Sequence, residues 1–386
     1  MSLKLGILAG EASGDNLGAG LMRALSEQSG ERVQFVGVGG ERMIAAGLDS
    51  LAPIELLQVN GFREPLARLP ALVRLMRRLT RALVAADVDA FIGVDFNVFN
   101  FLLESALRKR GLATVHYVSP SVYAWRSGRT RRVEKSADVL LCLYPFEPAF
   151  YTGLHVDARF VGHPLADAID PSMSAAPARA AARAKLSVAD ASQVLAVLPG
   201  SRRSEVALMI DGFLDAAARF CATHPGTAVV IPCLRKTLRD EVQRAVQRHP
   251  DLPVTVYDGD ARLPLTACDI ALVKSGTSTL EATLLHRPMV VSYRLGWFTY
   301  QLARRLVRSP FVALPNILAG RELVPELLQD AATPAALAAA LTAELHKSRS
   351  DADAEAPFVA LHEQLRQGAD ANAAAAVLRL VAQRHP

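Results

Sequence analysis

Short runs of apolar residues alternate with longer amphipathic stretches along most of the chain. Each run is rich in Val, Ile and Leu and is followed by a turn of small or polar residues. Such runs are typical of strands buried on both faces of a parallel sheet, and the stretches between them have apolar positions at helical spacing. In the first part of the chain, strands are expected at residues 3–9, 33–37, 91–95, 114–119, 139–143 and 160–165.

The same alternation returns in the second part of the chain. Strands are expected at residues 194–198, 228–232, 254–257, 270–273 and 289–293, and the alanine-rich stretches 334–345 and 356–384 are expected to be helical. Strands that alternate with helices indicate parallel α/β sheets. The pattern therefore predicts two Rossmann-like α/β domains that face a cleft.

A stretch rich in Ala, Pro and Ser separates the two patterns, and we interpret it as a linker. A chain of 386 residues is long enough for two cores. The expected organisation is a first domain at 1–168, a linker at 169–185 and a second domain at 186–350. Helices at 351–386 are expected to pack back on the first domain or on a partner chain.

The turn at residues 199–205 is the first candidate for ligand binding. An apolar strand precedes it and an amphipathic helix follows it. Gly200 lets the backbone approach a ligand closely, and the amides of Ser201 and its neighbours open a helix, where anions bind. Arg202 adds a guanidinium suited to a diphosphate. The alternative is an ordinary turn with solvated arginines, since neither a Walker loop nor Gly-x-Gly-x-x-Gly is present.

A second strand–turn–helix segment follows at residues 269–285. Ser275, Gly276 and Thr277 offer hydroxyls and amides at another helix start, and Glu281 lies near the first turn, where a carboxylate can take two ribose hydroxyls. Two such turns in one domain predict a nucleotide at the carboxyl ends of parallel strands. The alternative is that Glu281 is an ordinary glutamate of a helix start.

In the first part of the chain, acidic residues follow the expected strands. Glu11 and Asp15 follow the first strand, and Asp95 ends the strand at 91–95. Ligands of open α/β sheets bind at this edge, so these carboxylates are candidate catalytic groups. Each of them can instead be a helix N-cap or a first-turn carboxylate.

The stretch 65–86 is both basic and amphipathic. A helix of this kind can lie in a membrane interface, where each arginine contributes about 1 kcal/mol near anionic lipid. The alternative is a helix packed on the core with a solvated basic face. The residues expected to contact a membrane are Leu66, Leu69, Leu72, Val73, Met76, Arg74, Arg77 and Arg78.

Composition narrows the class of protein. Although 51% of the residues are hydrophobic, no stretch reaches the roughly 18 apolar residues of a membrane span. The start has no signal-peptide pattern, and the four cysteines are far apart with no Cys-x-x-Cys. We therefore expect a cytoplasmic location, no disulfide framework and no zinc. A net charge of +5 suits anionic ligands or surfaces but is too small to indicate nucleic acid.

Several of these segments together resemble the lipid-A-disaccharide synthase family, bacterial membrane-associated glycosyltransferases of the two-domain GT-B type. The resemblance covers most of the chain, in this order: Gly10-Glu-Ala-Ser-Gly-Asp15, Tyr117-Val-Ser-Pro-Ser-Val-Tyr-Ala-Trp-Arg126, Pro145-Phe-Glu147, Phe160-Val-Gly-His-Pro164, Leu198-Pro-Gly-Ser-Arg202, Ser275-Gly-Thr-Ser-Thr-Leu-Glu281, Pro315-Asn316 and Ala319-Gly-Arg-Glu322.

The resemblance implies transfer of 2,3-diacylglucosamine from UDP to the 6-hydroxyl of 2,3-diacylglucosamine 1-phosphate (lipid X), with inversion, forming a β-1,6 disaccharide. It implies that the second domain holds UDP, that the first receives the acceptor, and that no metal or other cofactor takes part. It places the chain on the inner face of the inner membrane, favours membrane contact by the stretch 65–86 and leaves a homodimer open. The implied donor residues are Gly200, Ser201, Arg202, Ser275, Gly276, Thr277, Glu281, Asn316, Arg321 and Glu322, with Arg202 also stabilising the departing UDP.

The chain departs from the family pattern at the expected general base. The family typically has Gly-Ile-Asp-Ala/Ser-Pro-Asp-Phe-Asn, and the second aspartate is the favoured base. Here residues 93–100 read Gly-Val-Asp-Phe-Asn-Val-Phe-Asn, so Val98 takes that place. Either Asp95, Glu11 or Asp15 acts instead, with Asp95 preferred, or the chain is a slow or silent paralogue that binds lipid or nucleotide-sugar. An isomerase similar to UDP-sugar 2-epimerases is a further alternative.

Overall fold

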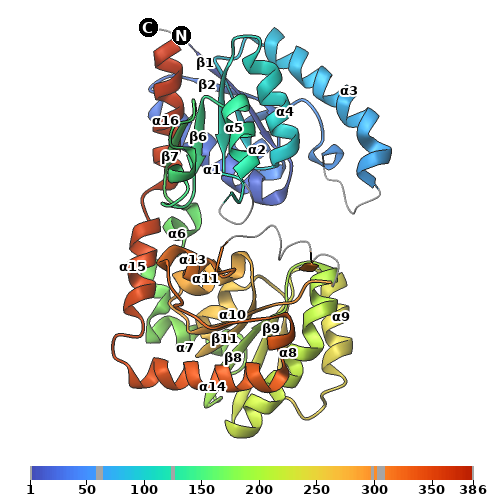
Figure 1. Cartoon of the computed structure of the whole chain (residues 1–386), viewed down its shortest axis with the longest axis vertical. Helices are drawn as coiled ribbons and strands as arrows, with labels where there is room; N and C mark the ends of the chain where they lie inside the picture. Colours follow the sequence, from blue (N-terminus) through green and yellow to red (C-terminus); the bar gives the residue numbers. More distant parts are fainter. Residues whose placement is uncertain (1, 58–63, 123–126, 297–299, 302–308, 385–386) are drawn as a thin grey trace. The chain divides into compact units, whose positions relative to one another are not determined.

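The computed structural model of the chain describes residues 2–57, 64–122, 127–296, 300–301 and 309–384. These residues form two compact α/β units, which Figure 1 traces from blue to red along the sequence. The first unit contains Met1–Asp167 and Leu365–Pro386, and the second contains Ala168–Gln364. The chain therefore returns to the first unit for its last helix.

The first unit is built on a parallel seven-stranded sheet with the order β3-β2-β1-β4-β5-β6-β7. Residues Ala90–Val94 and Ala113–Tyr117 are buried along their whole length, because helices cover both faces of the sheet. The strands are β1 (Leu3–Ala9), β2 (Val33–Val38), β3 (Leu48–Ser50), β4 (Ala90–Val94), β5 (Ala113–Tyr117), β6 (Val139–Cys142) and β7 (Asp157–Phe160).

Neighbouring residues of the first strand point to opposite faces of this sheet. Ile7 packs with the core under α1 and α16, and Leu8 packs with the core under α3 and α4. The helices of this unit are α1 (Ala12–Gln28), α2 (Glu41–Ala45), α3 (Glu64–Ala85), α4 (Asn97–Arg108), α5 (Thr130–Ser136), α6 (Pro164–Ala168) and α16 (Ala369–Arg384), with 3₁₀ turns η1 (Ile54–Leu56), η2 (Ser127–Arg129) and η3 (Pro148–Tyr151).

The second unit has a parallel six-stranded sheet with the order β10-β9-β8-β11-β12-β13. Helices α8 and α14 pack on one face, where Phe213 and Leu341 meet Val197 of the central strand. The strands are β8 (Gln193–Leu198), β9 (Thr227–Pro232), β10 (Val254–Tyr257), β11 (Ile270–Lys274), β12 (Met289–Tyr293) and β13 (Glu326–Leu328).

Helices of the second unit connect these strands and cover the sheet. They are α7 (Ala176–Lys185), α8 (Arg203–Thr223), α9 (Lys236–Val246), α10 (Arg262–Ala267), α11 (Thr277–Leu284), α13 (Leu314–Ala319), α14 (Pro334–Ser350) and α15 (Ala356–Leu365), with 3₁₀ turns η4 (Pro171–Ser174) and η5 (Gln329–Ala331). Two parallel α/β sheets are the architecture that the alternating pattern predicts.

Three expected elements differ from the structure. The last strand of the first unit lies earlier than residues 160–165: β7 covers Asp157–Phe160, and α6 begins at Pro164. Residues 171–185 are not an extended linker but η4 and α7, which belong to the second unit because Arg183 donates to Asp269 at 2.5 Å. The last helical stretch is two helices, since Gly368 adopts a positive φ of 72° between them.

The strand order reverses direction in the middle of each sheet. In the first unit β1 lies between β2 and β4, and in the second β8 lies between β9 and β11. Connections from the two central strands therefore run to opposite sides and leave a crevice at their carboxyl ends, where α/β proteins bind ligands. The two places are the turns after β1 and β4 and the turns after β8 and β11.

Candidate active site

The turn after β8 leads directly into the amino terminus of α8. Gly200 has φ of 131°, and a side chain there would lie 2.7 Å from Cβ of Glu205. Only glycine fits both requirements without strain. Ser201 and Arg202 are exposed, with 78% of the Arg202 side chain accessible. The predicted diphosphate residues thus lie at the crevice of the second sheet, with the guanidinium open to a ligand.

The carboxylate of Glu205 occupies the helix start that the sequence assigns to a phosphate. One of its oxygens accepts hydrogen bonds from the backbone N–H groups of Ser201 at 3.2 Å and Arg202 at 3.3 Å, and the other lies 3.1 Å from Nζ of Lys274. Burial raises the pKa of Glu205, but Lys274 and the two amides outweigh burial and lower it. Glu205 is therefore an anion held inside the candidate site.

Lys274 joins three neighbouring strands at this edge. It ends β11, contacts Glu205 beyond β8, and places its ammonium 4.5 Å from the ring centroid of Tyr293 at the end of β12. Burial and the charge of Glu205 raise the pKa of Tyr293. Sequence analysis missed all three residues. The one local signal that could have identified Glu205 is its place at the third position of a helix that follows a turn.

The turn after β11 is held by backbone and hydroxyl contacts. The N–H of Ser275 donates to the carbonyl of Ser292, and its hydroxyl donates to the carbonyl of Val312 at 2.8 Å. Gly276 and Thr277 are exposed at the start of α11. The Ser275 hydroxyl therefore anchors a neighbouring loop, and the next two residues present the open amides of the turn.

Glu281 lies on the second turn of α11 rather than its first. Its side chain is half-buried, and burial raises its pKa while nearby Arg262 acts in the opposite direction. Glu281 is therefore one helical turn away from Thr277, the first residue of α11. It lies near the carboxyl end of β11, where the sequence predicts that a ribose binds.

Asn316, one of the expected donor residues, uses both polar atoms of its side chain within the protein. It is fully buried, its amide nitrogen donates to the Val324 carbonyl and to Glu326, and its oxygen accepts from the N–H groups of Leu323 and Val324. Both polar atoms of the side chain make hydrogen bonds, which connect α13 to the segment before β13. Its role is to hold the turn that follows Gly320.

That turn presents the other two expected donor residues. Gly320 ends α13 with φ of 65°, and Arg321 and Glu322 follow it as exposed residues. Glu326 accepts the N–H groups of Val312 and Ala313, so the turn, the loop at 312–313 and the Ser275 turn form one connected framework. Arg321 and Glu322 are thus surface groups on a well-supported turn.

In the first unit, the central crevice is bordered by Glu11 and Asp95. Glu11 is the exposed N-cap residue of α1, and Asp95 is half-buried directly after β4. Asp95 and Phe96 both have left-handed backbones, with φ of 49° and 48°. Two successive non-glycine residues in this region indicate a strained strand-to-helix turn, which is typical of functional sites. The phenyl ring of Phe96 fills the space that a side chain at Gly10 would need.

Asp15 lies near this edge but is engaged with the backbone. It is 7% exposed, and its carboxylate accepts the N–H groups of Gly40, Arg42 and Met43 at 2.8 to 3.1 Å. These donors open the short helix α2, so Asp15 fixes the loop after β2 to α1. A carboxylate occupied in this way favours the N-cap interpretation over catalysis.

Val98 lies on the first turn of α4 and is 73% exposed. Leu102, one turn later, is 55% exposed on the same helix. Position 98, where the sequence resemblance leads us to expect a base, is therefore open to solvent and carries a hydrocarbon side chain.

The apolar side of α3 packs on the first unit in its second half. Leu79 and Leu83 are 1% exposed, and Leu72 and Met76 pack partly against the same core. This half agrees with the core-packed alternative. The side chains of Leu66 and Leu69 lie outside the described part of the structure. Residues 123–126, which belong to the sequence motif at 117–126, also lie outside it.

The basic side of α3 faces solvent. Arg74, Arg77 and Arg78 are exposed, and Val73 beside them is half-buried. Arg74 donates to the carbonyl of Pro70, and Arg78 to that of Leu51. The guanidinium groups therefore form an open cationic face on a helix that is anchored to the core.

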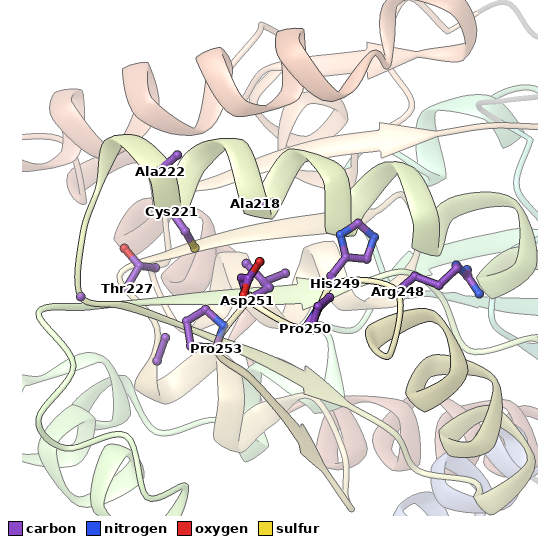
Figure 2. A pocket seen from close by; sticks show the side chains of 12 residues that line it. Ala218, Cys221, Ala222, Thr227, Arg248, His249, Pro250, Asp251 and Pro253 are labelled. Carbon is purple, nitrogen blue, oxygen red and sulfur yellow. The ribbon is translucent and has the colours of Figure 1, made fainter.

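A hollow of the second unit lies away from the candidate site. It is a cavity of about 670 Å³ lined by the end of α8, the start of β9 and the loop before β10, as Figure 2 shows with Cys221, Thr227, His249 and Pro253. These positions are at the amino edge of the sheet, and the candidate donor residues are at the carboxyl edge. Ligands of parallel sheets bind at the carboxyl edge.

Within the described residues, no cluster of three or more His, Cys, Asp or Glu side chains has the arrangement of a metal site. Within the same residues, no helix has both the length and the apolar character that crossing a bilayer requires.

Some known proteins are similar to this chain in sequence, and others are similar to it in fold. A family model described as lipid-A-disaccharide synthetase matches residues 5–377. A lipid-A-disaccharide synthase from Pseudomonas aeruginosa (strain LESB58) is 48% identical over 382 residues, which is 99% of each chain. One from Burkholderia thailandensis is 46% identical over 386 residues, 100% of this chain and 98% of the relative.

Solved structures with the same fold are more distant in sequence. A putative UDP-N-acetylglucosamine 2-epimerase from Listeria monocytogenes superposes with a TM-score of 0.65 at 12% identity, covering 100% of this chain and 97% of the other. A UDP-forming α,α-trehalose-phosphate synthase from Burkholderia vietnamiensis gives 0.60 at 14% identity, covering 100% and 99%. These likenesses show the GT-B fold, and the match over residues 5–377 shows that the chain belongs to the lipid-A-disaccharide synthetase family.

Proposed function

We propose that the chain transfers 2,3-diacylglucosamine from UDP to the 6-hydroxyl of 2,3-diacylglucosamine 1-phosphate, forming the β-1,6 lipid A disaccharide and UDP. The observation that carries this proposal is the family match over nearly the whole chain. The donor motifs of that family lie here at the central crevice of the second sheet. Lipid A biosynthesis is therefore the process in which the chain acts.

The donor half of the reaction belongs to the second unit. Ser201 and Arg202 bind the diphosphate, with Gly200 allowing its close approach, and Gly276 and Thr277 contribute the second set of amides. Arg202 stabilises the charge that develops on the departing UDP, since its guanidinium is exposed and matches two phosphate oxygens. Glu281 takes the ribose hydroxyls.

The remaining residues of the donor site either contact the donor at the surface or support the turns that do so. Arg321 and Glu322 contact the donor from their exposed turn, and Asn316 keeps that turn in place. Ser275 ties the loop at 312–313 to the β11 turn. This division separates residues whose loss weakens binding directly from residues whose loss also destabilises the fold.

The acceptor half belongs to the first unit, where Asp95 is the general base. A base must be positioned to take the proton of the acceptor hydroxyl as the bond forms. Asp95 follows β4 directly, on a strained turn at the central crevice, and Val98 cannot accept a proton. Glu11, across the crevice on α1, is the second candidate, and Asp15 is the weakest because three backbone N–H groups already hold it.

Membrane contact follows from the acyl chains of both substrates. The exposed arginines of α3 face the anionic inner surface of the inner membrane, and the chain binds there peripherally. The core-facing leucines in the second half of α3 anchor this helix to the first unit. A homodimer is not needed for α16, which packs on α1 of its own chain.

The test is disaccharide formation by the purified chain from UDP-2,3-diacylglucosamine and its 1-phosphate acceptor, with Asp95→Ala beside it. Loss of at least 100-fold in kcat, with UDP binding unchanged, supports Asp95 as the base. Activity that survives in D95A moves the role to Glu11. A parent chain that binds UDP and forms no disaccharide would support the silent-paralogue alternative, and sugar epimerisation by the parent would support the isomerase.

A further inference from the structure

A single buried asparagine holds the turn that carries Asp95. Asn100 is fully buried on the first turns of α4. Its amide nitrogen donates to the backbone carbonyl of Asp95 at 2.8 Å, and lies 3.3 Å from that of Val94 and 3.4 Å from that of Leu8. One side chain therefore joins the ends of β1 and β4 to the helix that follows them.

The turn needs such support because its backbone is unfavourable. Asp95 and Phe96 are both left-handed, and this region costs a non-glycine residue about 1 kcal/mol or more. The N–H of Asp95 donates to the carbonyl of Tyr117 at 2.8 Å, and the N–H of Asn100 donates to that of Phe96 at 3.3 Å. Backbone contacts fix the N–H groups, and the Asn100 side chain fixes the Asp95 carbonyl.

Behind Asn100 lies a buried pair of side chains. Glu104, one helical turn further along α4, places Oε1 2.6 Å from Nδ1 of His116 on β5, and both side chains are 0% exposed. Gly93 supplies the space: a side chain there would overlap Glu104 Oε1 and lie 3.0 Å from Cγ of Asn100. The side chains of Asn100 and Glu104 therefore both pack against Gly93 of β4.

Two oxygens of this cluster have no hydrogen-bond partner among the described residues. They are Oδ1 of Asn100 and Oε2 of Glu104, and both are buried. Asn100 and Glu104 lie one helical turn apart, and both approach the position that a side chain at Gly93 would take, so the two oxygens belong to neighbouring buried side chains. A donor within reach of both oxygens would satisfy them and would hold the amide of Asn100 in the orientation that supports the turn.

We propose that Asn100, held from behind by Glu104 and His116, is the positioning residue that sets where the Asp95 carboxylate lies. The inference rests on the proposed role of Asp95 in the transfer reaction. Asn100 does not touch the reacting atoms. It acts through the carbonyl of Asp95, and a shift of about 1 Å at a catalytic group can lower a rate 100-fold.

Asn100→Asp tests whether the Asn100 side chain holds the turn in place. The substitution keeps the size of the side chain and removes the N–H donor that faces three backbone carbonyls. We expect kcat to fall at least 30-fold, with the KM for each substrate and the affinity for UDP within threefold of the parent. Asn372→Asp is the control for the change of chemistry: Asn372 is an exposed residue of α16, and its amide nitrogen also donates to two backbone carbonyls, of Val161 and Gln367.

Glu104 variants test the support without touching Asn100, and they answer the question if N100D does not fold. A glutamine at 104 keeps an oxygen next to His116 Nδ1 and adds an N–H donor in place of the second oxygen, whereas a leucine offers neither group. We therefore expect E104Q to retain kcat within threefold of the parent and E104L to lose at least tenfold. Equal losses of kcat in E104Q and E104L would contradict the proposal that Glu104 supports Asn100.

A readout independent of turnover separates this inference from the proposed function. The ¹³C resonance of the Asp95 side-chain carboxyl, assigned by its loss in D95N, is expected to move in N100D and E104L and to stay in place in N372D and E104Q. An unmoved resonance in N100D and E104L overturns the inference even in an active enzyme. A moved resonance in a chain that makes no disaccharide supports the inference and counts against the proposed function.

Discussion

The ammonium of Lys274 lies 3.1 Å from Oε1 of Glu205, and both side chains are at least 85% buried. This pair connects the carboxyl end of β11 to the first turn of α8. It crosses the central crevice of the second sheet, which is where the strand order reverses. The two turns assigned to the nucleotide are therefore held together by an ion pair that lies within the site itself.

Replacement of Lys274 by methionine should weaken both the fold and nucleotide binding. The change removes the buried cation of Glu205 and leaves only the exposed Arg202, 3.8 Å from the same oxygen, so we expect about 2 kcal/mol less stability, between the values for exposed and buried pairs. UDP affinity should fall about tenfold, because Glu205 then competes with the diphosphate for Arg202. Urea unfolding and calorimetric titration measure these two effects.

The control for this prediction is Lys347→Met. Lys347 also pairs with a glutamate, at 3.5 Å from Glu344, but it is 52% exposed. Its loss should change stability by less than about 0.5 kcal/mol and leave UDP binding unchanged. Equal effects of K274M and K347M would contradict a special role for the Glu205–Lys274 pair.

Asn316 and Arg321 should respond differently to alanine. Asn316→Ala removes hydrogen bonds to Leu323, Val324 and Glu326 inside the protein, which predicts a loss of about 3 kcal/mol in unfolding free energy. Arg321→Ala changes an exposed side chain, so stability should stay within about 0.5 kcal/mol while UDP affinity falls. Denaturant unfolding and UDP titration of the two variants give the comparison, and a destabilised R321A with normal UDP affinity would contradict it.

Val98→Asp should raise turnover. The residue is 73% exposed on the first turn of α4, so a carboxylate there is solvated and is favoured by the helix dipole. Stability should change by less than about 0.5 kcal/mol. A second carboxylate beside Asp95 supplies the proton acceptor of the family pattern, and we expect kcat to rise about tenfold or more.

Val98→Asn is the control for this substitution, since it is polar but is not a base. If V98D and V98N have the turnover of the parent, position 98 does not contribute to proton transfer in this chain. A rise in V98N equal to that in V98D would assign the effect to polarity rather than to a base.

Mild acid should destabilise the first unit through His163. Burial lowers the pKa of His163 to about 4, whereas an unfolded histidine titrates near 6.5. The unfolded chain therefore binds the proton first, so this contribution is complete above about pH 6.5 and is lost as the pH falls toward 4. Between pH 7 and pH 5 the loss is roughly 2 kcal/mol.

Urea unfolding at the two pH values measures this effect, and His163→Asn identifies its source. An asparagine oxygen can still accept the N–H of Leu165, which Nδ1 of His163 accepts at 3.1 Å. The variant should therefore show a smaller difference between pH 7 and pH 5. An unchanged difference would assign the acid sensitivity to other groups, such as buried His286, whose pKa burial also lowers to about 4.

Charge reversal on α3 should weaken binding to anionic vesicles. Arg74 and Arg77 are exposed, and each cation near such a surface contributes about 1 kcal/mol. R74E/R77E should therefore bind vesicles that contain phosphatidylglycerol about 30-fold more weakly or worse, as measured by co-sedimentation. The matched variant K236E/R244E, on exposed positions of α9 in the second unit, should bind as the parent does. Equal binding by both would contradict membrane contact through α3.

The hydrophobic pattern was sufficient to predict the two parallel sheets. Buried strands such as β4 and β8 are continuous apolar runs, so their type and approximate bounds follow from local sequence. The short edge strands β3 and β13 were missed because three residues carry too little pattern. The helix α7 was taken for a linker because its alanines carry little hydrophobic signal, and its place depends on the ion pairs of Arg179 and Arg183 with Asp269.

Sequence alone also placed Gly200, Arg202 and Asp95 at strand ends, because a turn of small and polar residues after an apolar run is a local signal. What each side chain contacts depended on residues distant in the chain, and only the tertiary structure decided it. Asp15 is held by the loop after β2, Asn316 by the segment before β13, and Glu205 by Lys274. Those partners meet only when strands pair in the sheet, because hydrogen bonds and ion pairs act over a few ångströms whereas the sequence records only separation along the chain.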